Sequence, residues 1–372
     1  MSEMLNNKDT SEILAEITME VERRVPDWLG DTAKLATPSP ELKQYPNSYI
    51  ARYQVHVNGD VKTLLVKVPS KPHIKSLSEA LSRDDSQSRA REQYAAAMTV
   101  WNAIAEENDK TCLAVKPFAH LYNWNAVVME EVDGKMLKAF LLRPAIVFRL
   151  PKAWKELRQV LCNSVRWLRV VHHRIGKPQT TSINVGDLKN QIEDELIALQ
   201  QYSKEQINIE PFRQKIYELL AVVSNSTVPT ALLHDDFQYS NILISSSGSA
   251  CALDSSFSHR GPVYSDIATL LVDPETRLVQ LLSFGLFLPK QGVIQLRELV
   301  LESYFQDSPI NQLSLKLYCA LAILHKWIVN EKRFSSGGIK QLLSPLLLPI
   351  IRYRFKRVLK PYLSFQIERK QS

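Results

Sequence analysis

The chain has few of the cysteines that are typical of disulfide-rich secreted proteins and of zinc-binding proteins. Its 372 residues include only four cysteines, and these lie far apart. No CxxC pair is present, which argues against a zinc site and against a disulfide framework. Because reduced, scattered cysteines are typical of a reducing compartment, we expect a cytoplasmic protein. The four positions are Cys112, Cys162, Cys251 and Cys319.

Long hydrophobic runs are also missing. A membrane-spanning helix needs roughly 18 or more consecutive apolar residues, and no segment has them. The nearest candidate, LVQLLSFGLFLPKQGVIQL, is interrupted by Pro289, Lys290 and three glutamines. The first residues, MSEMLNNKDTSEILAEI, are polar and acidic, unlike a signal peptide. We therefore expect a globular protein without a spanning helix.

Acidic residues are scarce at the end of the chain. From Lys340 onward there are eight basic residues and one acid, Glu368, so this segment accounts for the whole net charge of +7. Within PIIRYRFKRVLKPYL, an apolar helical face is predicted, made of Ile351, Phe355, Val358, Leu359 and Tyr362.

Two interpretations of this basic tail, residues 340–372, remain open. Basic amphipathic helices lie on anionic membrane surfaces, which would give a peripheral membrane contact. Alternatively, the helix packs on the preceding helical part and leaves its basic side in solvent. Nucleic acid is not an expected partner, because no aromatic residues are interleaved in a basic groove outside the tail.

The pattern of apolar residues divides the rest of the chain. Residues 1–34 form a polar lead-in with one amphipathic helix through Ile13, Ile17 and Val21. Two alternating segments, SYIARYQVHV and VKTLLVKVP, flank an Asn-Gly-Asp turn and predict a β-hairpin. The polar stretch KPHIKSLSEALSRDDSQSRA is predicted to be a mobile loop. A helix is predicted from about Arg89, and CLAVKPFAHL and AVVMEEV are predicted strands.

A second, mostly helical part follows. Its clearest helical patterns are KELRQVLCNSVRWLRVVHHRI and IEPFRQKIYELLAVVSN. Two short apolar strands, NILIS and ACALD, joined by the turn SSSGS, predict another hairpin. We thus expect an α+β chain with a β-rich N-lobe at 35–132, a helical C-lobe at 133–339, and the tail at 340–372.

The stretch LLHDDFQYSNILI places polar side chains at the start of that second hairpin. Asp236 precedes Asn241 by five residues, and Asp254 follows the strand ACAL. Carboxylate and amide oxygens of this kind suit Mg²⁺. A further carboxylate can take a proton from an attacking hydroxyl, as phosphoryl transfer requires.

A matching cation is present in the first part of the chain. Lys67 lies within the apolar strand LLVKVP, where a lysine without a partner would be costly. Glu92, on the next predicted helix, is the expected partner.

This set of motifs resembles the aminoglycoside and choline phosphotransferase family, whose members have a protein-kinase-like fold. HDDFQYSN is similar to the family's H-x-D-x-x-x-x-N catalytic loop, and CALDSSFSHRGPVYSDIATLL to the metal-binding segment that follows it. VMEEVDGKML resembles the hinge between lobes, and SVRWLRVVHH the helix ahead of the loop. The resemblance extends from about residue 47 to residue 271.

The resemblance implies a two-lobed enzyme that uses ATP and Mg²⁺. In this family the matching positions imply that Asp236 is the catalytic base and that Asn241 and Asp254 bind the metal. The resemblance also implies that Lys67, fixed by Glu92, holds the phosphates. Backbone groups of Glu130 and Val132 would contact the adenine. His234 and Asp266 would support the loop.

The chain departs from the family pattern at several places. Asp235 stands where glycine is frequent, and Gln238 where histidine is frequent. No glycine-rich loop is present, and the resemblance implies that Asn47 and Ser48 contact phosphate in its place. We expect a phosphotransferase that acts on a hydroxyl of a small molecule, such as a sugar, glycan or similar alcohol.

Three alternatives remain. A pseudokinase would bind nucleotide or a partner without transfer. A protein kinase is less consistent with the sequence, since no A-P-E-type activation segment follows Asp254. A helical phosphohydrolase with an HD metal cluster would need the pair His234-Asp235 inside a helix, whereas NILI reads as a strand.

Overall fold

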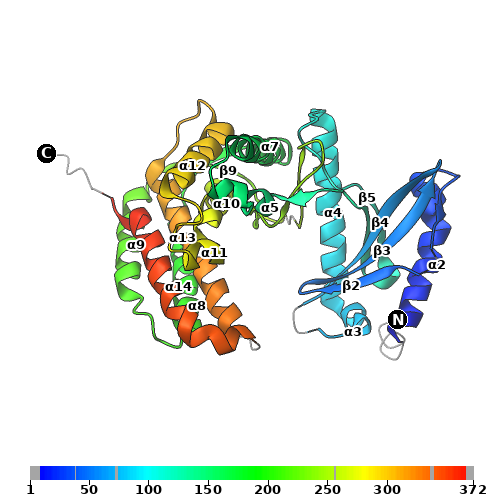
Figure 1. Cartoon of the computed structure of the whole chain (residues 1–372), viewed down its shortest axis with the longest axis horizontal. Helices are drawn as coiled ribbons and strands as arrows, with labels where there is room; N and C mark the ends of the chain where they lie inside the picture. Colours follow the sequence, from blue (N-terminus) through cyan, green and yellow to red (C-terminus); the bar gives the residue numbers. More distant parts are fainter. Residues whose placement is uncertain (1–8, 38, 72–73, 255–256, 336–338, 366–372) are drawn as a thin grey trace. The chain divides into compact units, whose positions relative to one another are not determined.

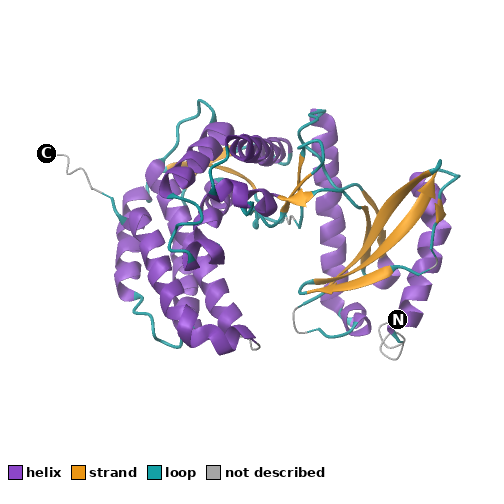
Figure 2. Cartoon of the chain, in the orientation of Figure 1, coloured by secondary structure: helices purple, strands orange, loops and turns teal. Residues whose placement is uncertain are grey.

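The structure is a computed structural model that describes residues 9–37, 39–71, 74–254, 257–335 and 339–365 (Figure 1). It divides into two compact units. The N-terminal unit comprises Met1–Gly134 with Leu253–Ser256, and the C-terminal unit comprises Lys135–Ala252 and Phe257–Ser372. Strands dominate the middle of the first unit and helices the second (Figure 2), which confirms the predicted α+β class.

The N-terminal unit contains one antiparallel sheet. Its strand order is β1-β3-β4-β6-β5, with β2 paired to β3. The predicted hairpin is confirmed: Val57 pairs with Asp60, and both Asn58 and Gly59 have positive φ, as a two-residue hairpin turn requires. The strands are β1 (Lys34–Leu35), β2 (Glu41–Tyr45), β3 (Ser48–Val57), β4 (Asp60–Pro69), β5 (Pro117–Leu121) and β6 (Ala126–Glu130).

Helices α2 (Thr10–Leu29) and α4 (Asp84–Glu107) lie on opposite sides of this sheet (Figure 1). The apolar face predicted in the lead-in is buried: Ile13, Ile17 and Val21 share one core with residues of β3 and β4. The helix of the lead-in is therefore an integral part of the N-terminal unit. A 3-10 turn, η1 (Tyr122–Trp124), connects β5 to β6.

The mobile loop predicted between β4 and α4 was wrong. The stretch contains helix α3 (Leu77–Ser82) and the first turns of α4; residues 72 and 73 lie outside the described part. The side chain of Ser76 caps α3 by accepting a hydrogen bond from the Glu79 amide at 3.1 Å. Leu77, Ala80 and Leu81 then enter the core, so three apolar residues at helical spacing suffice to order a polar sequence.

The C-terminal unit is mainly helical. The two predicted helices are confirmed as α7 (Pro151–Arg174) and α9 (Glu210–Val223). The others are α5 (Leu137–Leu141), α6 (Pro144–Val147), α8 (Val185–Tyr202), α10 (Tyr264–Thr276), α11 (Leu278–Leu282), α12 (Lys290–Phe305), α13 (Gln312–Ser335) and α14 (Ile339–Leu363).

Two small antiparallel sheets lie among these helices. One has the order β11-β10-β7, and its β10–β11 ladder confirms the hairpin predicted from NILIS and ACALD. The other has the order β12-β9-β8. The strands are β7 (Lys135–Met136), β8 (Gln179–Ser182), β9 (Thr227–Leu232), β10 (Ile242–Ile244), β11 (Ala250–Ala252) and β12 (Arg260–Pro262).

The basic tail packs on the C-terminal unit. The predicted apolar face of α14 is buried, and the ring of Phe355 stacks on Trp327 of α13 with centroids 5.4 Å apart. Arg352 donates two 2.8 Å hydrogen bonds to the fully buried carboxylate of Glu331. Of the two interpretations of the tail, the described residues of α14 agree with packing on the helical part, because the apolar face from Ile351 to Tyr362 contacts protein.

No helix among the described residues is long and apolar enough to cross a membrane.

The tail should contribute strongly to stability through its buried face. Replacing Phe355 by alanine removes a fully buried ring and should lower the free energy of unfolding by about 3–5 kcal/mol. Tyr353→Ala, two residues away on the exposed side, should change it by less than about 0.5 kcal/mol. Urea denaturation of both variants checks this, and equal effects would contradict the packing of the tail.

Candidate active site

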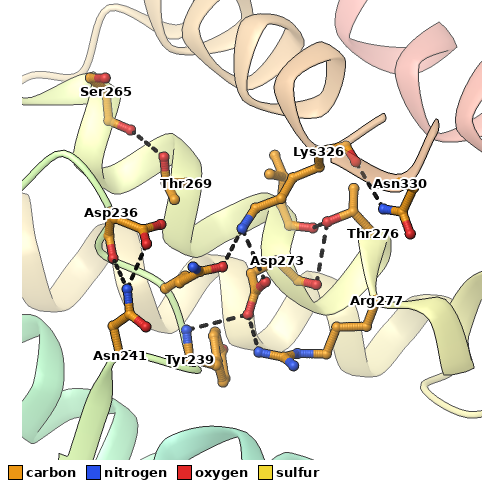
Figure 3. A network of polar contacts seen from close by, with 12 residues as sticks. Asp236, Tyr239, Asn241, Ser265, Thr269, Asp273, Thr276, Arg277, Lys326 and Asn330 are labelled. Atoms are coloured by element: carbon orange, nitrogen blue, oxygen red, sulfur yellow. Dashed lines mark hydrogen bonds and ion pairs between the residues drawn. The ribbon is translucent and has the colours of Figure 1, made fainter. Parts of the chain in front are cut away.

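The loop between β9 and β10 brings together the two residues selected by their five-residue spacing. The side-chain amide of Asn241 donates to the carboxylate of Asp236 at 2.6 Å and to its carbonyl at 3.1 Å (Figure 3). Two backbone hydrogen bonds, from Gln238 to Asp236 and from Asn241 to Gln238, fold the loop into tight turns. Asp236 therefore lies in a preorganised loop with its carboxylate held by a neutral donor.

A buried carboxylate supports this loop from behind. Asp266, at the start of α10, accepts hydrogen bonds from the backbone amides of His234 at 2.7 Å and Asp235 at 2.9 Å. A ring nitrogen of His172 lies 3.0 Å from the same side chain. Burial by itself would raise the pKa of Asp266, but His172 and the donated hydrogen bonds outweigh it and hold the pKa below its ordinary value. The supporting position predicted for Asp266 is thus occupied by an anion.

His234 is a packing residue of the loop. Its ring is 1% exposed, lies against the rings of Trp167, Phe237 and Phe257, and has no hydrogen-bond partner at either nitrogen. Burial lowers its pKa, which the neighbouring carboxylates only partly oppose. The imidazole is therefore neutral near pH 7, and it supports the loop by packing against the aromatic rings.

Asp235 owes its position to backbone conformation. Its φ is +73°, in the left-handed region that is costly for most side chains, free for glycine and tolerated by aspartate and asparagine. The glycine frequent at this position in the resembling family and the aspartate here meet the same requirement. Its carboxylate also lies 3.4 Å from His259.

A second polar network lies next to the loop and was not predicted (Figure 3). Asp273 of α10 accepts from the backbone amide of Tyr239 at 3.3 Å and pairs with Arg277. Lys326 of α13 donates to Gln238 and lies 3.6 Å from Asp273. Gln238 and Tyr239, between Asp236 and Asn241, are thereby connected to two helices. In the sequence, Asp273 and Lys326 stand next to apolar residues of their helices, and this was the signal available for them.

In the N-terminal unit, Lys67 has a different partner from the predicted one. Its ammonium group pairs with Asp254, whereas Glu92 is exposed on α4 and has no contact with it. The buried side of α4 carries Gln93, with Ala96 and Val100 at helical spacing, so the predicted carboxylate is one residue out of phase. The Lys67–Glu92 pair is therefore corrected to Lys67–Asp254.

The other predicted nucleotide contacts lie at the ends of strands. Asn47 lies in the turn between β2 and β3, and the buried Ser48 is the first residue of β3. The Asn47 carbonyl accepts a hydrogen bond from the Ser70 amide at 2.8 Å. The amide of Glu130 is already bonded to Lys116 within the sheet, and Val132 follows in the segment after β6. The contacts of these four residues with a nucleotide therefore stay predictions.

Two side chains carry oxygen atoms of the kind that a hard divalent cation prefers. Because the Asn241 amide nitrogen is engaged by Asp236, its oxygen remains the atom suited to a metal. Asp254, which belongs to the N-terminal unit, has a carboxylate that is 62% exposed. The pairing of Ile242 with Ala252 puts the residues just before β10 and just after β11 at one end of the ladder.

The HD phosphohydrolase alternative is excluded by the same region. His234 and Asp235 lie in a loop, not inside a helix. No group of three or more His, Cys, Asp or Glu side chains that could hold a metal occurs among the described residues. A site built from one amide and one carboxylate does not need such a group, because Mg²⁺ keeps several waters and binds substrate phosphates.

The backbone at Asp235 gives a direct test. Asp235→Gly should leave the free energy of unfolding nearly unchanged, because glycine adopts φ of +73° freely. Asp235→Val should lower it by about 1–3 kcal/mol, since a β-branched residue is strained there. Urea denaturation distinguishes the two, and a valine variant as stable as the glycine variant would contradict the assigned conformation.

The buried imidazole gives a pH dependence. His234 has a lowered pKa in the folded protein, so below about pH 6.5 the unfolded state binds more protons. Stability should therefore fall as the pH drops from 7 to 5, by at most about 1.4 kcal/mol per pH unit for this group.

His234→Leu should flatten that dependence without removing any ring hydrogen bond. The contribution of His120, whose pKa is also lowered by burial, remains in both proteins and serves as an internal reference. Free energies of unfolding measured across this pH range check the difference, which identical slopes would refute.

Comparison with known proteins identifies the fold. No family model and no curated protein sequence matches the chain. Among solved structures, a glucosamine kinase superposes with a TM-score of 0.55 at 13% identity, covering 95% of this chain and 82% of its own.

Two further structures agree with it. A putative aminoglycoside phosphotransferase from Ralstonia eutropha has a TM-score of 0.51 at 14% identity, covering 95% of this chain and 98% of its own. An ethanolamine kinase from Plasmodium vivax has a TM-score of 0.50 at 12% identity, covering 96% and 89%. The chain therefore has the protein-kinase-like fold of these small-molecule phosphotransferases.

Proposed function

We propose that the protein is an ATP- and Mg²⁺-dependent phosphotransferase that moves the γ-phosphate to a hydroxyl of a small molecule. The observation that carries the proposal is the hydrogen bond between Asp236 and Asn241 in the loop that leads into β10, within a protein-kinase-like fold. Such a loop offers a carboxylate and an amide oxygen at fixed spacing, which phosphoryl transfer needs.

Asp236 takes the role of base. Its carboxylate accepts the proton of the attacking hydroxyl, and the Asn241 amide keeps it oriented for that task. Asp266 and the Asp273–Lys326 network fix the backbone on both sides of Asp236, so the carboxylate does not have to be ordered when the acceptor binds.

Asn241 and Asp254 are the residues that would hold Mg²⁺. When bound, the metal neutralises the charge that develops on the transferred phosphoryl group. Lys67 is the cation available for the nucleotide phosphates, and its pairing with Asp254 compensates both charges.

The remaining predicted contacts complete the nucleotide site of the proposal. Asn47 and Ser48, in a turn between two strands as phosphate-binding turns are, would contact phosphate. Backbone groups of Glu130 and Val132 would contact adenine. Glu92 has no part in the revised set, because it is exposed.

The acceptor is proposed to be a neutral or anionic alcohol, such as a sugar or glycan. The solved structures with this fold are named as kinases or phosphotransferases of glucosamine, ethanolamine and aminoglycosides. A polycationic aminoglycoside would require a surplus of carboxylates for its amines, whereas the excess charge of this chain is positive and lies in its last part.

One experiment tests this function against the pseudokinase alternative. Purified protein is given Mg·ATP and a panel of sugars and other alcohols, and both ADP release and nucleotide binding are measured. Asp236→Asn should lower turnover about 10²–10⁴-fold while nucleotide binding is retained. Asp235→Asn, which removes the same charge and also tolerates positive φ, should have a far smaller effect.

The outcomes distinguish the phosphotransferase hypothesis from the pseudokinase hypothesis. Turnover that depends on Asp236 supports the phosphotransferase. Nucleotide binding without turnover of any acceptor supports a pseudokinase, and turnover that survives Asp236→Asn would contradict the assigned base.

A further inference from the structure

The outward side of α14 differs from the face that packs on the protein. At 100° per residue, Leu342, Leu346, Tyr353 and the basic residues at 356, 357 and 360 fall within a sector of about 100°. Ile351, Phe355, Val358 and Tyr362 lie on the opposite side and are buried. The helix thus has two different faces, and among the described residues only one of them is covered by the rest of the C-terminal unit.

The first half of the outward side is strongly apolar. Leu342 is 81% exposed, Leu346 68% and Tyr353 51%. Large apolar side chains exposed to this degree on adjacent turns of one helix form a patch, unlike the single exposed leucines that are common on protein surfaces.

The second half of the same side is cationic. Lys356, Arg357 and Lys360 are exposed, and no carboxylate among the described residues pairs with them. Helix α14 contains no aspartate or glutamate in its 25 residues. The guanidinium of Arg357 lies 5.9 Å from the ring of Tyr353, where the apolar and the cationic halves meet.

A segment that contacts another side of α14 also exposes apolar side chains. The turn after α11 exposes Phe284 and Leu286, by 54% and 79%. It is connected to α14 by Arg354, whose guanidinium lies 5.8 Å from the Phe284 ring. The exposed apolar residues therefore come from two separate parts of the C-terminal unit.

We propose that the outward side of α14 binds an anionic membrane surface. Leu342, Leu346 and Tyr353 would enter the interface between headgroups and acyl chains, and Lys356, Arg357 and Lys360 would meet the lipid phosphates. The helix would lie along the membrane, because its outward residues span about 27 Å of helix length.

The charges favour a membrane over other partners. A second copy of this face would offer no carboxylate to the cations, since α14 contains no aspartate or glutamate, so an interface between two such faces would bury unpaired positive charge. Nucleic acid would match the cations but not the exposed leucines. The inference does not depend on the proposed function, and it uses the face opposite to the one that the sequence predicts.

Vesicle flotation with the full chain tests the proposal. Wild-type protein should float with phosphatidylcholine vesicles that contain phosphatidylserine, but not with pure phosphatidylcholine, and raising the salt concentration should weaken binding. Leu342→Ser/Leu346→Ser should lower binding. Lys356→Gln/Arg357→Gln/Lys360→Gln should lower it more than about tenfold at low salt, since each cation contributes roughly fivefold.

A charge-matched control separates specific from general electrostatic binding. Lys177→Gln/Lys189→Gln/Lys204→Gln removes the same charge from exposed lysines elsewhere in the C-terminal unit and should bind like wild type. Thermal unfolding of each variant shows that the substituted surface positions leave the fold intact.

Three results would overturn the proposal. The first is that wild-type protein does not float with phosphatidylserine vesicles at low salt. The second is that the control triple variant loses as much binding as the α14 triple variant. Concentration-dependent dimerisation that Leu342→Ser/Leu346→Ser abolishes, without vesicle binding, would assign the surface to a second copy of the chain.

Discussion

The candidate site depends on one buried carboxylate. Asp266 accepts two consecutive backbone amides, those of His234 and Asp235, and so fixes the direction in which the chain enters the loop. The positive φ of Asp235 then changes the direction of the chain directly after these two donors. Asp236 follows directly, so its position is a consequence of this arrangement.

Contacts around the loop stabilise that arrangement. His172 compensates the buried charge of Asp266, and aromatic rings close around His234. On the far side of Asp236, Asp273 and Lys326 hold Tyr239 and Gln238. The loop is thus fixed at both ends by helices of the C-terminal unit, and these contacts offset the cost of the positive φ at Asp235.

Local patterns were sufficient for much of this account. The hairpin turn at Asn58-Gly59 and the five-residue step from Asp236 to Asn241 depend on neighbours in sequence, and both were predicted. Partners on distant elements could not be predicted. Lys326 reaches Gln238 from a helix 88 residues later, and the choice between Glu92 and Gln93 depends on the rotation of α4 against the sheet. Similarly, the apolar pattern of α14 does not say whether protein or lipid covers it, and Trp327 decides this only in the folded chain.

The central claim is that Asp266 positions Asp236 for phosphoryl transfer, and steady-state kinetics of Asp266→Asn test it most directly. An asparagine has one acceptor oxygen for two amides, so one hydrogen bond is lost with little change in volume. The account predicts a large loss of kcat for the acceptor that wild type phosphorylates, with the KM for ATP nearly unchanged. A variant with wild-type kcat would show that the loop does not depend on this carboxylate.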